Sequence, residues 1–147
     1  MEPTSVDTKN QTVAANHSEK ITSVLEALKA QRLKLFFQPV ACLTGAVESY
    51  YDVSVRLYTP EGNEMFAAEF IRDINHNPVA FKIDQWVILQ SIKQLLVYNK
   101  KAKTGKLLIH LSSATFYDVT FISWLSLILE KSKIKPSSLV FQIETQY

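Results

Sequence analysis

The stretch Tyr50-Tyr51-Asp52-Val53-Ser54-Val55-Arg56-Leu57 alternates strictly between apolar and polar side chains after its first residue. Successive side chains of a β-strand point to opposite faces, so this period of two predicts a half-buried strand. Its polar face carries the Asp52 carboxylate and the Arg56 guanidinium, roughly 13 Å apart at about 3.3 Å per residue. One ligand could therefore contact both groups. The alternative is a solvated face on which the two charges form a loose ion pair.

Composition describes one globular domain. The chain has 147 residues, of which 47% are hydrophobic and 20% charged, and this length allows a sizeable core. A net charge of +2 argues against nucleic acid or a membrane surface as the main partner. The single cysteine, Cys42, rules out an internal disulfide framework and a cysteine zinc cluster, and we expect it to be a small core residue. Without a secretion signal or a long apolar run, we expect a cytoplasmic protein without membrane insertion.

The N-terminal third predicts a leader, a helix and a strand. Residues 1–17 are polar and aperiodic, so we expect a flexible leader or interdomain linker, with the domain itself at 18–147. A helix should begin at Ser18 and end near Arg32. The apolar run 35–40 predicts a buried strand that bends or ends at its proline. Within it, Gln38 needs hydrogen-bond partners, which are either a nucleobase edge or backbone groups of the core.

Helices and strands alternate through the rest of the chain. We expect one helix at 67–74, a second that begins with Asp84 as its N-cap, and a third that begins at Asp118 or Thr120. Strands are expected at 106–111 and 139–143. This order predicts an α/β fold with mostly parallel strands. In such folds functional side chains gather at the carboxyl ends of strands, where His110 is a candidate ligand or base, although a satisfied core histidine is the more common case. A closed eight-stranded barrel needs about 250 residues, more than are present.

Five motifs in register resemble one family. They are Phe36-Phe37-Gln38-Pro39-Val40, Tyr51 to Leu57, Lys82-Ile83-Asp84-Gln85-Trp86-Val87, Ile109-His110-Leu111-Ser112 and Phe141-Gln142-Ile143-Glu144-Thr145. From about residue 19 onward, their order and spacing resemble the EAL domain, the family of cyclic di-GMP phosphodiesterases. The resemblance implies the N-terminal half to two-thirds of a modified TIM (β/α)8 barrel in which one early strand is antiparallel.

Within this family the chain is most similar to the degenerate FimX-type domains. The resemblance implies binding of cyclic di-GMP without cleavage, a role in type IV pilus assembly and twitching motility, and a PilZ-domain protein as partner. It also implies a cytoplasmic protein that can be placed at the cell pole. No cofactor would be required, and cyclic di-GMP would be the ligand.

The resemblance also assigns roles to single residues. Metal-binding positions of the family fall on Asp52, His110 and Thr145, where the family has glutamate, asparagine and glutamate, and its remaining ligands would follow Tyr147. The metal site is therefore degenerate and we expect no catalytic residue. The implied ligand-binding residues are Gln38 at a guanine, Arg56 at a phosphate, Asp84 near a guanine edge, and Val53 and Ser54 in the signature itself, where serine replaces leucine.

Three functions remain open at this point. The first is a catalytically inactive cyclic di-GMP receptor, the second a protein-interaction remnant without nucleotide binding, and the third residual phosphodiesterase activity in a longer protein. An open half-barrel would expose core residues and a strand edge, so we expect a longer chain or a homodimer.

Overall fold

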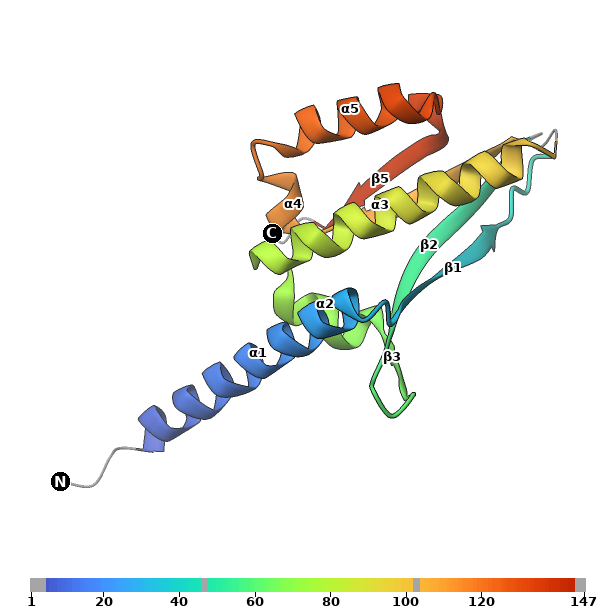
Figure 1. The fold of residues 1–147 in the computed structure, drawn as a ribbon. Coiled ribbons are helices and arrows are strands. Elements are labelled where there is room, and N and C mark those ends of the chain that lie inside the picture. Colours follow the sequence, from blue (N-terminus) through green and yellow to red (C-terminus); the bar gives the residue numbers. More distant parts are fainter. Residues whose placement is uncertain (1–4, 46–47, 102–103, 145–147) are drawn as a thin grey trace.

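The computed structural model describes residues 5–45, 48–101 and 104–144 (Figure 1). Its first helix, α1, spans Ser5–Lys29 and ends just before Gln31, which adopts a left-handed backbone with φ 57°. The expected start at Ser18 is therefore wrong, because the helix begins at Ser5. Residues 13–20 are exposed, whereas Val24 and Ala27 are buried in the core. Val24 and Ala27 thus anchor the C-terminal half of α1 to the rest of the molecule.

One mixed sheet organises the fold. Its strands are β1 (Leu33–Val40), β2 (Ser49–Tyr58), β3 (Glu64–Phe66), β4 (Gly105–Leu111) and β5 (Leu139–Ile143). The order is β1-β2-β4-β5, with β3 also paired to β2. Strands β1 and β3 run antiparallel to β2, while β4 and β5 continue the sheet in parallel. This confirms the α/β prediction with an antiparallel early strand. The short strand β3 was not predicted.

The helices follow the predicted order, with differences at their ends. Helix α2 (Ala67–Ile74) confirms the prediction, and α5 (Phe121–Ser132) has Thr120 as its N-cap residue. Helix α3 spans Pro78–Asn99, and the Asn77 side chain caps it by accepting a hydrogen bond from the Val79 amide. The prediction of Asp84 as N-cap is wrong, since proline favours the first turn of a helix and the asparagine before it is a strong cap. The four-residue helix α4 (Ser113–Phe116) and the 3-10 turn Pro136–Ser138 were not predicted.

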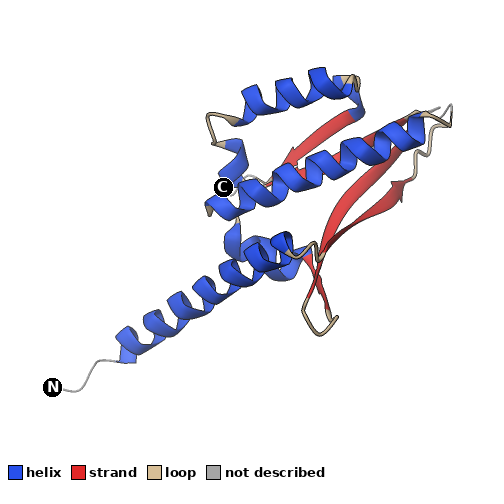
Figure 2. Cartoon of the chain, viewed as in Figure 1, coloured by secondary structure: helices blue, strands red, loops and turns tan. Residues whose placement is uncertain are grey.

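The core lies on one face of the sheet. Helix α3 runs along the strands (Figure 2) and buries Ile83 and Ile88 against it. The strand residues of the same face are also buried, namely Val53, Val55, Leu57, Leu107, Ile109 and Leu111. At roughly 25 cal/mol per Å² of apolar surface, this face supplies the main driving force for folding. The alternation predicted for residues 51–57 is therefore confirmed.

Two expectations about burial are wrong, because the run 35–40 does not form a buried strand and Cys42 is not a core residue, and the core alternatives for Gln38 and His110 are excluded. Strand β1 is an edge strand of the described sheet, and Gln38 near its end is exposed rather than held in the core. Cys42 is exposed in the loop that follows, within hydrogen-bond distance of the Thr44 hydroxyl. His110 points to the face opposite the core and is exposed. Gln38 and His110 lie where the sheet turns a side chain away from the helices, whereas Cys42 lies in a loop.

Among the described residues, no helix is both long and apolar enough to cross a membrane.

Candidate functional site

The sheet face opposite the core collects five of the predicted site residues. Across β1 and β2, Gln38 lies opposite Asp52, and Lys34 lies opposite Arg56. On β4, Leu108 is the partner of Asp52, so His110, two residues on, shares this face. We call this surface the open face, defined by Gln38, Asp52, Ser54, Arg56 and His110.

Asp52 and His110 form a pair on the open face. His110 Nε2 lies 2.9 Å from Asp52 Oδ1, and the two side chains are 54% and 36% exposed. The alternative in which Asp52 and Arg56 form a loose ion pair is excluded, because each contacts a different partner. The two sheet neighbours β3 and β4 supply those partners.

The side chains of Asp52 and His110 are poor ligands for the divalent cations that phosphodiesterases use. One carboxylate and one imidazole are present, and Thr145 lies outside the described residues. Within the described ranges no three or more His, Cys, Asp or Glu side chains group together as a metal site would require. Carboxylate and amide oxygens suit Mg²⁺ and Mn²⁺, whereas an imidazole suits zinc or copper better. The pair is thus poorly matched to a hard cation.

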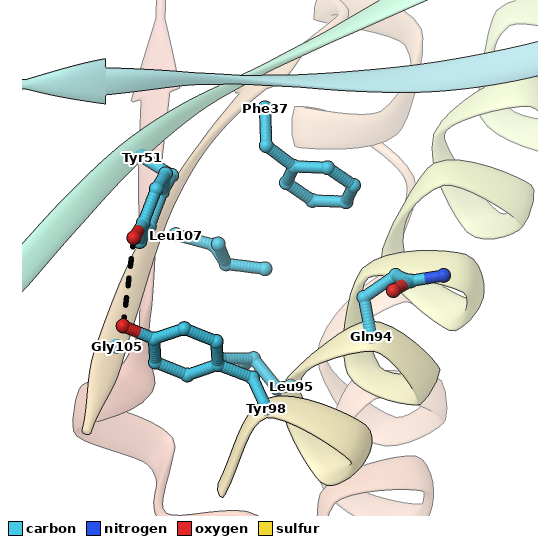
Figure 3. Close-up of a pocket in the computed structure, with 7 residues that line it drawn as sticks. All are labelled: Phe37, Tyr51, Gln94, Leu95, Tyr98, Gly105 and Leu107. Carbon is cyan, nitrogen blue, oxygen red and sulfur yellow. Dashed lines mark hydrogen bonds between the residues drawn. The ribbon is translucent and has the colours of Figure 1, made fainter. Parts of the chain in front are cut away.

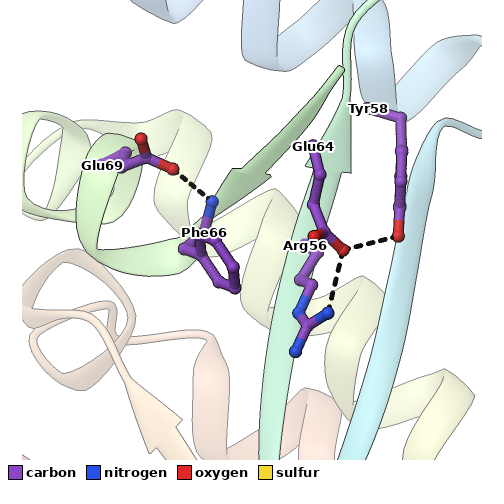
Figure 4. A network of polar contacts seen from close by, with 5 residues as sticks. All are labelled: Arg56, Tyr58, Glu64, Phe66 and Glu69. Carbon is purple, nitrogen blue, oxygen red and sulfur yellow. Dashed lines mark hydrogen bonds and ion pairs between the residues drawn. The ribbon is translucent and has the colours of Figure 1, made fainter. Parts of the chain in front are cut away.

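Arg56 lies in an aromatic and acidic environment (Figure 4). Its guanidinium carbon is 3.7 Å from the ring centroid of Phe36 and 4.9 Å from that of Phe66. Its Nη1 donates to Glu64 Oε1 at 2.9 Å, and the Tyr58 hydroxyl donates to the same oxygen at 2.8 Å. The hydrogen bond from Arg56, followed by that from Tyr58, lowers the pKa of the Glu64 carboxyl. The cation is oriented by stacking and paired with an acid that a stronger anion could displace.

Sequence reasoning missed the part of this environment that β3 supplies. Glu64 and Phe66 come from β3, and the amide of Phe66 donates to Glu69 Oε2 at 2.5 Å, which fixes the junction with α2 (Figure 4). A signal was present, because Pro60 and Gly62 mark a turn that joins two antiparallel strands. Gly62 has φ 89°, a conformation that glycine adopts without strain.

Asp84 lies away from the open face, in the second turn of α3. It is 4% exposed, and its Oδ2 accepts from the Ser112 amide at 2.8 Å, the Ser112 hydroxyl at 2.7 Å and the Thr115 hydroxyl at 2.5 Å. Burial raises the pKa of this carboxyl, while the hydrogen bonds from Thr115 and Ser112 act in the opposite direction. Asp84 therefore ties α3 to the carboxyl end of β4. Its contact with a guanine stays a prediction.

The two remaining signature residues point in opposite directions. The Val53 side chain is 4% exposed and packs in the core, so it supports the open face from behind. Ser54 is exposed on the open face, opposite Phe36 of β1. With the exposed Gln38 amide, the Arg56 cation and the exposed ring of Phe66, the face offers hydrogen-bonding, anion-binding and stacking groups. These are the groups that a nucleotide requires.

Comparison with known proteins places this architecture in a family. The family model of the EAL domain matches residues 21–147. A crystal structure of the FimX EAL domain is 41% identical, with a TM-score of 0.78 over 84% of this chain and 50% of that chain. The FimX EAL domain from Pseudomonas aeruginosa bound to c-di-GMP is 40% identical, with a TM-score of 0.73 over 84% of this chain and 49% of that chain.

A curated relative is also similar over most of the chain. The signaling protein YkoW of Bacillus subtilis is 24% identical over 118 residues, which are 80% of this chain and 15% of that protein. The chain thus spans about half of the FimX domain structures and a small part of its curated relative. The family match, the antiparallel first strand and the identity with FimX agree, and the chain belongs to the EAL domain family.

Proposed function

We propose that this chain is part of a cyclic di-GMP receptor that does not hydrolyse its ligand. The observation that carries the proposal is the Arg56 guanidinium, held between two aromatic rings on the open face of the sheet. A guanidinium binds a phosphodiester without a metal, through charge-assisted hydrogen bonds. The 40% identity with a FimX EAL domain bound to c-di-GMP supports this choice of ligand.

The roles proposed for single residues follow from their chemistry. Arg56 contacts a ligand phosphate, Gln38 hydrogen-bonds a guanine edge with its exposed amide, and Ser54 borders the ligand. Val53 contributes only from the core side, by packing behind the open face. Asp84 is buried away from the open face, so its proposed role at the guanine edge is indirect, by holding the carboxyl end of β4 in place through Ser112.

Absence of hydrolysis is the second part of the proposal. Hydrolysis in this family needs divalent cations that activate water. The Asp52–His110 pair occupies positions at which the family has carboxylate and amide ligands, and this donor set fits such cations poorly. We therefore expect binding without turnover and without a cofactor.

The biological setting is proposed by likeness to FimX. A 41% identity supports a role in type IV pilus assembly and twitching motility, with a PilZ-domain protein as partner. We place the protein in the cytoplasm, at the cell pole, and expect it to act as a homodimer.

A pull-down with a PilZ-domain protein, in the presence and absence of cyclic di-GMP, tests the partner. Capture that is independent of the nucleotide would contradict the receptor role.

A second function is favoured by one observation. Glu64 already neutralises Arg56 at 2.9 Å, and a receptor must exchange this ion pair for a ligand phosphate. If the exchange is unfavourable, the domain is a protein-interaction surface without nucleotide binding. Calorimetric titration of cyclic di-GMP distinguishes the two functions, because a receptor binds at micromolar or lower concentration and an interaction remnant releases no heat.

A further inference from the structure

A small pocket lies on the helix side of the sheet, behind the open face (Figure 3). It has a volume of about 210 Å³ and is formed where the last turns of α3 pass over β1, β2 and β4. Its lining residues are Phe37, Tyr51, Gln94, Leu95, Tyr98, Gly105 and Leu107. None of them belongs to the open face. The pocket is therefore separate from the proposed nucleotide site.

The volume limits the size of an occupant. Sites for drug-sized ligands have roughly 300–1,000 Å³, whereas an apolar cavity of roughly 150 Å³ already binds benzene. A space of about 210 Å³ accommodates one or two fused rings, and it is too small for a cyclic dinucleotide. Figure 3 shows the rings of Phe37 and Tyr98 on opposite sides of this space, with Leu107 between them. Such walls suit a flat ring that stacks or meets them edge to face.

The pocket has a few polar groups at its edge, which favour an occupant that carries one hydrogen-bonding group. Gln94 is exposed, and its amide offers both a donor and an acceptor. The Tyr51 and Tyr98 hydroxyls lie 3.4 Å apart, with their rings edge to face at 6.0 Å between centroids. Because these two hydroxyls already pair with each other, the Gln94 amide is the group that we assign to a hydrogen bond with the occupant. All three groups lie at the edge of an otherwise apolar space.

We propose that this pocket binds a small planar aromatic molecule that carries one hydrogen-bonding group, of the indole or phenol class. Tyr51 directly precedes Asp52 in β2, and Leu107 is its partner in β4. An occupant of the pocket thus contacts β2 on its helix side, opposite the open face. The pocket does not depend on the nucleotide site, because its lining residues are different.

Titration with indole, followed by protein NMR, tests the proposal on the whole chain. We expect saturable shifts of the Gln94 side-chain amide and the Gly105 backbone amide, with a Kd on the order of 0.1–1 mM for a ligand of this size. Benzene should bind more weakly because it lacks the hydrogen-bonding group. Shifts that do not saturate, or that spread evenly over the surface, would overturn the proposal.

Two variants locate the site. Phe37→Ala removes one aromatic wall, and we expect it to weaken indole binding about tenfold. Gln94→Ala changes an exposed helix residue without disturbing the core, and should weaken binding roughly two- to tenfold by the loss of one hydrogen bond. The neighbouring exposed Lys93→Ala is the matched control and should leave the Kd unchanged. Equal affinity in the Gln94 and Lys93 variants would contradict the assigned pocket, whatever the result with cyclic di-GMP.

Discussion

At the scale of single residues, Arg56 is the group on which the proposed nucleotide binding depends. Its guanidinium is partly buried between Phe36 and Phe66, so it is oriented before any ligand arrives. We expect Arg56→Ala to weaken cyclic di-GMP binding about 10- to 100-fold, which corresponds to the loss of charge-assisted hydrogen bonds. Isothermal titration calorimetry measures the change. Lys82→Ala, an exposed cation on α3, is the control and should bind as the wild type does.

In the proposed receptor, Glu64 competes with the ligand for the same guanidinium. We expect Glu64→Gln to tighten cyclic di-GMP binding by up to about fivefold, because partly exposed ion pairs contribute roughly 0.2–1 kcal/mol. The exposed Glu61→Gln, in the preceding loop, is the matched control. Weaker binding in the Glu64 variant alone would show that the carboxylate organises the site instead of competing for it.

Asp84 makes stability depend on pH with a defined sign. Burial raises the pKa of its carboxyl in the folded state, so the folded state holds a proton that the unfolded state releases. This contribution is fully present below the unfolded pKa of about 3.9 and is lost as the pH rises through the folded pKa. We expect wild type to lose stability relative to Asp84→Asn over this range, in urea unfolding at a series of pH values. A relative gain for wild type would contradict the sign.

Sequence reasoning placed several candidate site residues on one face of a strand but did not predict their partners. Strict alternation placed Asp52, Ser54 and Arg56 on one face, which the structure confirms. The pairs Asp52–His110 and Arg56–Glu64 join different strands, and a single chain pattern does not contain the register between strands. For the same reason the edge position of β1, and with it the exposure of Gln38, was not predicted.

At the scale of elements, α1 divides into an exposed and an anchored part. Residues 13–17 are exposed, whereas Val24 and Ala27 lie in the core. We expect removal of residues 1–17 to change the free energy of unfolding by less than about 1 kcal/mol, as surface changes usually do. Removal of residues 1–28 should prevent cooperative unfolding. A large loss in the shorter truncation, measured by thermal circular dichroism, would contradict the proposed boundary at 18.

Elements with a clear period were predicted well, and those defined by capping or pairing were not. The ranges of α2 and β5 agree with the sequence pattern, because each is bounded by turn residues. Helix α3 begins nearly two turns earlier than the expected N-cap Asp84, because Asn77 and Pro78 both end the preceding helical pattern and start a new helix. Strand β3 has only three residues, so its sequence is too short to show an alternating pattern. It is defined by its pairing with β2.

At the scale of the whole molecule, exposed apolar side chains suggest self-association. Phe116, Tyr117, Val119 and Ile122 follow β4 closely in the chain and are 49–93% exposed. Neighbouring apolar side chains of this size on a surface often mark an interface. We expect a concentration-dependent homodimer in sedimentation velocity, and Ile122→Glu should shift it to monomer. A monomer of the unchanged chain at about 100 µM would contradict the proposed homodimer.

The most direct test of the central claim is calorimetric titration of cyclic di-GMP in the presence of a chelator, repeated with Mg²⁺ or Mn²⁺ and followed by analysis of the nucleotide. Because Arg56 and Gln38 need no cation, we predict micromolar or tighter binding in both conditions, with the cyclic dinucleotide recovered intact. Failure to bind with the chelator present, or accumulation of the linear dinucleotide once the metal is added, would contradict a receptor that binds without hydrolysis.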